Sequence, residues 1–202
     1  MGAQRTLIEA VESGNATVVA NLLRDGADPN ALDEMKHPML AVAALHGHTK
    51  VVKTLLEAQA AVDAKTPGGA TPLVLAISKG HGDVVELLVA AGAAVNERLS
   101  WGGSALTVAA KSGHEAVVQQ LLDNGASLDI LTLDKETPLM YAAMSGNVAV
   151  GEMLLDVKNN ASDLNRFGCS AMHYAASHGH AAMLRALVSA GANLDVLASV
   201  RP

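Results

Sequence analysis

The chain has 202 residues, a formal net charge of −6, and a composition that is 50% hydrophobic but only 2% aromatic. The negative charge excludes general binding to nucleic acid, which requires a basic face. The sequence has no apolar run of about 18 residues to cross a membrane, and no basic start with an apolar core to form a signal peptide.

The first residues, MGAQRT at positions 1–6, match the M-G-x-x-x-[ST] pattern for N-myristoylation, with Gly2 as the acceptor. The alternative is that Met-Gly is an ordinary start and that the first helix begins too soon to leave a free tail. Even if the modification occurs, one acyl chain gives only marginal attachment to a membrane.

A glycine recurs every 33 residues, at Gly14, Gly47, Gly80, Gly113, Gly146 and Gly179. Such a fixed interval is typical of stacked structural repeats and excludes most enzyme folds built around one core. The predicted repeats span residues 4–32, 33–65, 66–98, 99–131, 132–164 and 165–202. We predict one domain over residues 1–202, because neighbouring repeats cooperate through their interfaces.

Each repeat has the pattern of two short helices joined at its glycine. In the second repeat, Leu40 and Ala43 precede Gly47, and an apolar stripe over residues 51–56 follows it. Apolar offsets of one, four and five residues lie on one face of a helix. The sequence therefore predicts a helix, a turn, a second helix and then a long loop in every repeat.

The loops carry the expected signals for helix ends. A Gly-Ala step suited to a left-handed helix stop occurs at Gly26-Ala27, Gly92-Ala93, Gly125-Ala126 and Gly191-Ala192. Hydroxyl residues that cap the next helix are Thr71, Ser104, Thr137 and Ser170. Gln59 and Lys158 replace the helix-ending glycine, at an expected cost of about 1–2 kcal/mol each.

The series Thr-Pro-Leu, Ala-Ala, Gly-His, Val-Val, Leu-Leu, Gly-Ala-Asp at this spacing resembles the ankyrin repeat, over roughly residues 4–195. The resemblance implies an all-α fold: an ankyrin-repeat solenoid of stacked helix-turn-helix units with β-turn fingers. It also implies a protein-binding role without catalysis.

The histidines fit this resemblance. The family uses a histidine after the turn glycine to hydrogen-bond neighbouring loops, which corresponds here to His48, His81, His114 and His180. His173 resembles the histidine of the family's Thr-Pro-Leu-His. The cluster of His173, His178 and His180 leaves open a zinc-dependent enzyme, but no Cys-x-x-Cys or His-Glu-x-x-His accompanies it, so we predict no metal site.

No catalytic group and no cofactor site is predicted. The candidate nucleophiles Ser104, Thr137 and Ser170 serve as helix caps. No glycine-rich loop has the strand–loop–helix setting that phosphate binding requires. The carboxylates of the loops are expected to be solvated; they are Asp33, Glu34, Asp134 and Glu136.

In this family, partners usually bind in a concave groove formed by finger tips and first helices. The groove residues that the resemblance implies are Met35, His37, His46, Lys65, Lys79, Arg98, Trp101, Lys111, Leu133, Asp134, Tyr141, Met144, Arg166, Phe167, Tyr174 and His178. The four aromatic residues of the chain are all in this set, with Trp101 and Phe167 at equivalent finger tips. An aromatic tip has little to pack against in a monomer, whereas Trp and Tyr are favoured interface anchors.

Charge varies along the predicted groove. Basic residues fall in the third and fourth repeats, whereas Asp134 and Glu136 follow in the fifth. A partner with an acidic stretch beside an apolar one would fit that order.

The sequence therefore predicts a non-enzymatic scaffold or adaptor, monomeric by itself, that binds a protein or an extended peptide. The alternative is a regulatory or targeting ankyrin segment of a larger enzyme or channel. The lone Cys169 cannot form an internal disulfide, so we expect a reducing compartment: the cytoplasm, with the nucleus also possible.

Overall fold

The computed structural model describes residues 2–157 and 160–193, and these residues form an all-α fold. The chain divides into two compact bodies, Met1–Val95 and Asn96–Pro202. The single-domain assignment over residues 1–202 stays a prediction. The replacement at Lys158, and the end of the sixth repeat from residue 194 onward, lie outside the described residues.

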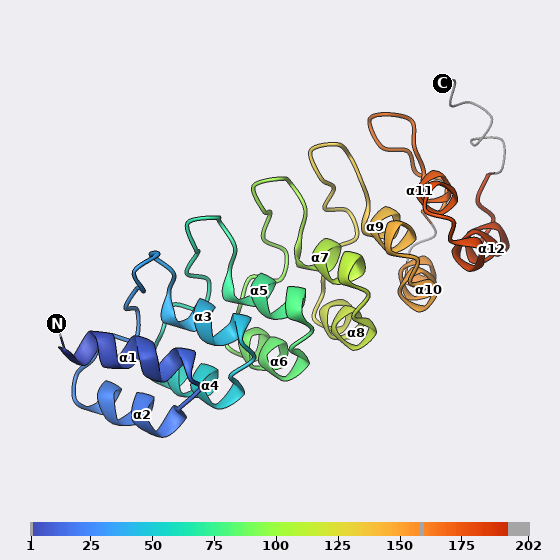
Figure 1. The fold of residues 1–202 in the computed structure, drawn as a ribbon. Coiled ribbons are helices and arrows are strands. Elements are labelled where there is room, and N and C mark those ends of the chain that lie inside the picture. The colour runs from blue at the N-terminus through green and yellow to red at the C-terminus, as the bar shows by residue number, and fades with distance from the viewer. Residues whose placement is uncertain (1, 158–159, 194–202) are drawn as a thin grey trace. The chain divides into compact units, whose positions relative to one another are not determined.

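The N-terminal body contains three helix pairs, one from each of the first three repeats (Figure 1). Its helices are α1 (Gly2–Glu12), α2 (Ala16–Arg24), α3 (Met39–Leu45), α4 (Thr49–Glu57), α5 (Pro72–Lys79) and α6 (Gly82–Ala90). The first helices α1, α3 and α5 pack side by side in one layer, and α2, α4 and α6 form a second layer.

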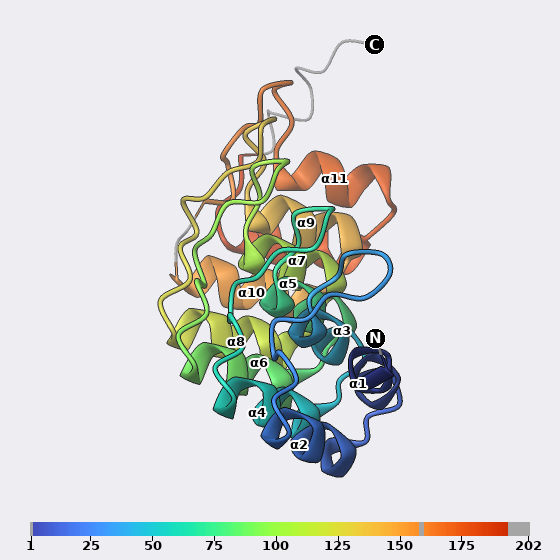
Figure 2. The same ribbon diagram turned by 90° about the vertical axis from the view of Figure 1, so that its left-hand side faces the viewer.

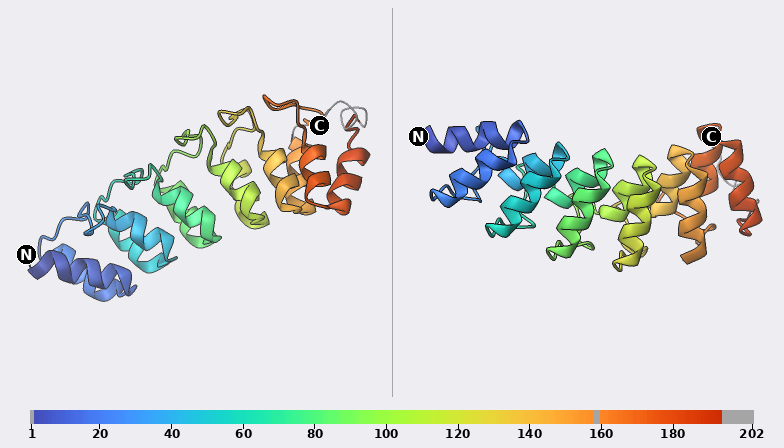
Figure 3. Two further views of the ribbon diagram at one scale, coloured as in Figure 1. Left: turned by 45° about the horizontal axis from the view of Figure 1, so that its top comes forward. Right: turned by 90° about the horizontal axis from the view of Figure 1, so that it is seen from below.

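The C-terminal body repeats this arrangement with three further pairs (Figure 2). Its helices are α7 (Ala105–Ser112), α8 (Glu115–Asp123), α9 (Pro138–Ser145), α10 (Val148–Val157), α11 (Ala171–Ser177) and α12 (Ala181–Ser189). Helix α9 packs between α7 and α11, and α10 packs between α8 and α12. Within each body, the long loops, which we call fingers, project from the helices on one common side (Figure 3).

The helix ends are the ones that the sequence predicts. Thr71, Ser104 and Thr137 cap α5, α7 and α9 by accepting a backbone N–H three residues later. Gln59 has the left-handed conformation of the glycine that it replaces, with φ of 64°. The predicted helix–turn–helix–loop order is therefore confirmed.

The turn glycine also explains how repeats stack. Gly47 has φ of +70°, and a Cβ atom placed on it would lie 2.6 Å from Nδ1 of His81 in the next repeat. With no side chain at Gly47 the imidazole can approach, and its Nε2 lies 3.1 Å from the carbonyl oxygen of Leu45. The imidazole of His81 thus fills the space that a side chain at Gly47 would occupy.

The other described contacts of this type follow the same register. Nε2 of His48 lies 3.0 Å from the carbonyl oxygen of Glu12, and Nε2 of His180 lies 3.1 Å from that of Met144. The fifth repeat has Asn147 at this position, and its Nδ2 donates to the carbonyl of Gly113 at 3.0 Å. The loop-holding role expected of the histidines is confirmed for His48, His81 and His180.

Candidate protein-interaction surface

In the C-terminal body, adjacent fingers are joined to one another by backbone hydrogen bonds. The N–H of Leu133 donates to the carbonyl of Trp101 at 3.1 Å, and the N–H of Arg166 donates to the carbonyl of Asp134 at 2.8 Å. The Arg166 guanidinium also pairs with the Asp134 carboxylate at 2.9 Å. The fingers of the fourth, fifth and sixth repeats are therefore fixed in series.

These fixed fingers carry exposed apolar side chains. Leu133 is 70% exposed, Phe167 is 67% exposed and Leu164 is 50% exposed. The Arg166 guanidinium carbon lies 5.6 Å from the centroid of the Phe167 ring. We call the fingers of these three repeats, together with the adjoining faces of α7, α9 and α11, the finger surface.

Trp101 is better packed than the sequence suggests. Its indole lies over Gly103, where an added Cβ atom would come within 2.1 Å of the ring. The same ring lies 6.0 Å from that of Tyr141, centroid to centroid, at an interplanar angle of 53°. The expectation that finger-tip aromatics have little to pack against therefore describes Phe167 and is wrong for Trp101, which still keeps 37% of its surface exposed.

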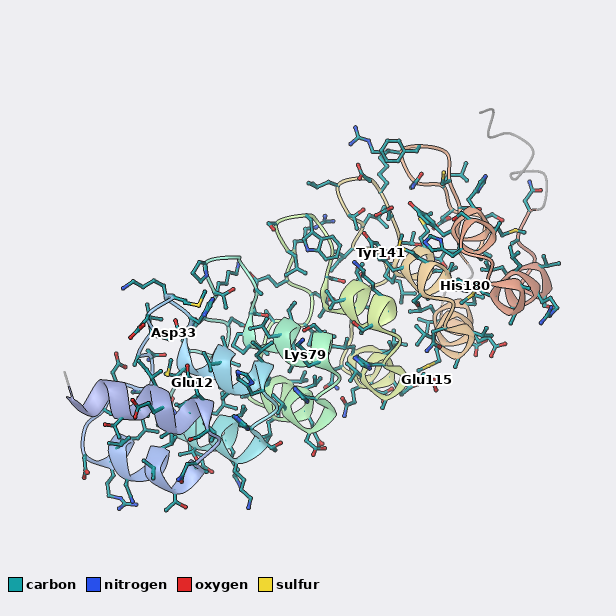
Figure 4. All side chains as sticks on the ribbon, viewed as in Figure 1. Glu12, Asp33, Lys79, Glu115, Tyr141 and His180 are labelled. Atoms are coloured by element: carbon teal, nitrogen blue, oxygen red, sulfur yellow. The ribbon has the colours of Figure 1, made fainter. Side chains whose placement is uncertain are left out.

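A single carboxylate connects the two tyrosines at the base of the fingers. The Tyr141 hydroxyl donates to Oε2 of Glu136 at 2.7 Å, and the Tyr174 hydroxyl donates to Oε1. The Thr132 hydroxyl makes a longer contact of 3.4 Å with Oε2. The expectation that Glu136 is solvated is wrong, because its side chain folds back between two first helices instead of pointing into solvent. Figure 4 shows Tyr141 close to the base of the fingers.

Asn165, in the finger of the sixth repeat, orients this cluster through hydrogen bonds. It is 5% exposed, and its Oδ1 accepts the backbone N–H groups of Phe167 and Cys169, both at 2.9 Å. Its Nδ2 then donates to the Tyr174 hydroxyl at 3.0 Å. Tyr174 therefore accepts from Asn165 and donates to Glu136, which fixes the direction of both hydrogen bonds. The sequence analysis did not predict a role for Asn165. Its only signal in the sequence is that this amide lies in the same finger as the aromatic tip Phe167.

The two phenols are held in their neutral form. Burial, and then the hydrogen bond to Glu136 and its charge, raise the pKa of Tyr141 and of Tyr174 well above the usual value of about 10. At neutral pH both hydroxyls are therefore donors, and Glu136 is the acceptor that they share.

This arrangement predicts a loss of stability in alkali. Near pH of about 10 the unfolded chain releases both tyrosine protons while the folded chain retains them, so the unfolded state binds fewer protons. The free energy of unfolding should then be insensitive to these groups below about pH 10 and fall as the pH rises above it. Urea denaturation of the wild type and of a Tyr141→Phe/Tyr174→Phe variant should show a steeper fall in the wild type. Equal slopes would contradict the assignment.

The N-terminal body offers a different feature on its fingers and first helices. A small, mainly apolar pocket of about 130 Å³ is lined by His37, Ala41, Val42, Leu45, Thr66 and Leu75. His37 is held there by Asp33, with Nδ1 to Oδ2 at 3.0 Å. Burial alone would raise the pKa of Asp33, but the backbone and side-chain hydrogen bonds from His37 outweigh it and lower the pKa. Asp33 is therefore only partly solvated.

The remaining predicted residues are distributed over both bodies. Met35 is 71% exposed on the finger of the second repeat, and the His46 ring stacks on that of His48 at 5.7 Å. Lys65 lies in a finger, and Lys79 is the last residue of α5. Their placement follows the expected register.

In the C-terminal body, the Arg98 guanidinium donates to the carbonyl of Leu131 at 3.2 Å, and Lys111 lies exposed on α7. Met144 is half-buried on α9, and the His178 ring stacks on that of His180 at 6.0 Å. The structure thus brings Trp101, Tyr141 and Tyr174 into one cluster, and separately pairs Asp134 with Arg166.

Each of the three histidines in the candidate zinc cluster contacts a neighbouring polar group. Nδ1 of His173 accepts the N–H of Ser170 at 3.0 Å, and Nε2 of His180 contacts the carbonyl oxygen of Met144. In the part of the chain that the structure describes, no group of three or more His, Cys, Asp or Glu residues could hold a metal ion. Every helix described also falls short of the length and hydrophobicity that crossing a bilayer requires.

The paired helices, the recurring loop contacts and the fingers define this protein as a helical-repeat solenoid. The family model for ankyrin repeats (3 copies) matches residues 7–99 and 106–198. The chain therefore belongs to the ankyrin-repeat family, as its sequence motifs predict. Ankyrin repeats are generally protein–protein interaction modules, and the fold is typically non-enzymatic.

Two relatives illustrate the similarity. The crystal structure of the human ASB11 ankyrin repeat domain superimposes with a TM-score of 0.85 at 29% sequence identity, covering 93% of this chain and 84% of that one. Cortactin-binding protein 2 of Rattus norvegicus is 41% identical over 71 residues, which is 35% of this chain. The match spans 4% of that much longer protein.

Proposed function

We propose that this protein is a non-enzymatic scaffold or adaptor that binds another protein, or an extended peptide, along its fingers and first helices. The observation that carries the proposal is the exposure of three large apolar side chains, Leu133, Leu164 and Phe167, on two fingers that are hydrogen-bonded to one another. Large exposed apolar side chains gathered on one surface mark interaction sites. A rigid support lowers the entropy that a partner loses on binding.

The N-terminal body supplies a second element of this proposal. The pocket beside His37 has the size of a small aliphatic side chain, and its walls include Ala41, Val42 and Leu45. Exposed Met35 belongs to the finger of the same repeat and adds an adaptable apolar contact. An apolar residue of the partner fits this pocket, whereas the finger surface of the C-terminal body suits larger apolar groups.

The proposal is tested by capturing partners with the wild-type chain, identifying them by mass spectrometry and measuring Kd for the purified pair. A Trp101→Ala/Phe167→Ala variant should bind at least about thirtyfold more weakly, corresponding to about 2 kcal/mol, because aromatic side chains dominate interface energies. Val188→Ala is the control, since Val188 is 42% exposed on α12 in the other helix layer. Equal affinity of the double variant, or a loss confined to Val188→Ala, would refute the finger surface as the binding site.

A second candidate is a regulatory or targeting segment within a larger enzyme or channel. The observation that favours it is the match to a short part of a much longer protein, of which this chain covers only 4%. In that case the same surface binds a domain of its own polypeptide. The length of the full reading frame separates the two candidates. For either one we propose a cytoplasmic location, on the basis of the single Cys169.

A further inference from the structure

The Glu136 carboxylate is a half-buried anion whose hydrogen-bond partners are all neutral. They are the hydroxyls of Tyr141, Tyr174 and Thr132. Within the described residues, no Lys, Arg or His pairs with Glu136, and the Arg166 guanidinium is engaged by Asp134 at 2.9 Å. The negative charge at the base of the fingers therefore forms no ion pair with a cation of the described residues.

Two aromatic rings stand next to this charge. The Tyr141 ring is adjacent because its own hydroxyl bonds Glu136, and the Trp101 ring is tilted against Tyr141 at 6.0 Å. Trp101 keeps 37% of its surface exposed, so part of this residue is accessible to a ligand. Aromatic faces attract cations, and a nearby carboxylate strengthens that attraction.

The carboxylate still has capacity to accept. A carboxylate offers about four acceptor positions, of which the three hydroxyls occupy at most three. Because Asn165 orients the Tyr174 hydroxyl toward Glu136, the charge is also held in a fixed position rather than swinging in solvent. A fixed anion beside exposed π faces is complementary to a planar cation that can both stack and donate.

We propose that this cluster, the Glu136 site (Glu136, Trp101, Tyr141 and Tyr174), receives an arginine side chain from the bound protein or peptide. The inference rests on the proposed interaction function and specifies the chemistry of its partner. A guanidinium is planar and weakly hydrated, so it can lie against the indole while its N–H groups reach the carboxylate. The lysine ammonium is a compact, strongly hydrated charge and gains less from the same surfaces.

The site can be tested without knowing the partner, because Trp101 is the single tryptophan of the chain and its fluorescence reports on the site directly. The probes are Nα-acetyl-argininamide, the matching lysinamide, and the citrulline amide, which has the shape of arginine without its charge. The argininamide should give a saturable change at a concentration at least about tenfold lower than the citrulline amide, with the lysinamide between them. Equal responses to the arginine and citrulline probes would overturn the proposal.

A matched pair of variants locates the effect. Glu136→Gln should weaken argininamide binding to the level of the citrulline amide. Glu115→Gln removes an identical charge on α8, in the other helix layer of the same body, and should leave binding unchanged (Figure 4). Retention of tight argininamide binding by a folded Glu136→Gln variant would overturn the proposal. The comparison of probes uses the unmodified chain, so it holds even if that variant does not fold.

Selection from a random peptide library on the wild-type chain separates this inference from the function on which it rests. Peptides enriched in arginine that compete with argininamide would support both. Peptides that bind the finger surface without arginine would overturn the Glu136 site and leave the interaction function standing. If argininamide binds at Glu136 but no peptide or protein binds to the chain, the cation site stands and the interaction function is refuted.

Discussion

Replacing Leu139 by alanine is expected to lower the free energy of unfolding by about 2–5 kcal/mol. Leu139 is 0% exposed on α9, the helix that packs between α7 and α11 in the C-terminal body. Truncation removes apolar contacts and leaves a cavity that a helix held on both sides cannot close. In a repeat protein the loss also weakens the coupling of α9 to each neighbour.

Leu133→Ala is the matched control, since it makes the same change in the same repeat at a side chain that is 70% exposed. Its unfolding free energy should stay within about 0.5 kcal/mol of the wild type. Urea denaturation followed by circular dichroism measures both variants. Partner binding should show the opposite order. Leu133→Ala should weaken binding more than Leu139→Ala does, because Leu133 lies on the finger surface. Equal destabilisation by the two changes would show that the assignment of core and surface is wrong.

The second large effect concerns Gly102, in the finger of the fourth repeat. Gly102 has φ of +86°, and an added Cβ atom would lie 2.7 Å from the backbone nitrogen of Leu133 in the next finger. Gly102→Ala should cost about 1–2 kcal/mol for the left-handed conformation, and a further 1–3 kcal/mol because the two backbones must move apart. The movement should also break the hydrogen bond from Leu133 N–H to the Trp101 carbonyl.

Gly168→Ala isolates the conformational part of that cost. Gly168 occupies the equivalent finger position with φ of +77°, but an added Cβ atom would meet nothing within 4 Å. This variant should lose only about 1–2 kcal/mol. Thermal and urea denaturation of both variants give the difference between them. A Gly102→Ala variant no less stable than Gly168→Ala would show that the fingers are not closely packed.

Lys135 has the same finger position in the fifth repeat and adopts a φ of 60° without being glycine. A left-handed residue alone therefore does not require glycine in these fingers. The next finger makes the same backbone hydrogen bond beside Lys135, from Arg166 N–H to the Asp134 carbonyl at 2.8 Å, so the further cost expected at Gly102 rests on the 2.7 Å spacing between an added Cβ atom and the Leu133 nitrogen.

The repeat length, the helix pairs and their ends could all be predicted from the order of the amino acids. These features depend on interactions within about four residues, such as the Thr71 cap of α5 and the left-handed Gln59, and they recur at each interval of 33 residues. Each of these local signals is weak alone, but the same signal at the same position of several repeats supports the same assignment. The recurrence also assigned the aromatic residues to fingers and first helices, because every repeat uses the same register.

Which of those residues contact one another depends on how the repeats stack in space. The hydrogen bond between Tyr174 and Glu136 joins residues 38 positions apart, and the ion pair between Arg166 and Asp134 spans 32. The repeat register places such side chains on the same surface without specifying their rotamers or the path of each finger. Glu136 turns inward to two phenol hydroxyls, and the second of them, from Tyr174, is supplied only once neighbouring repeats are stacked.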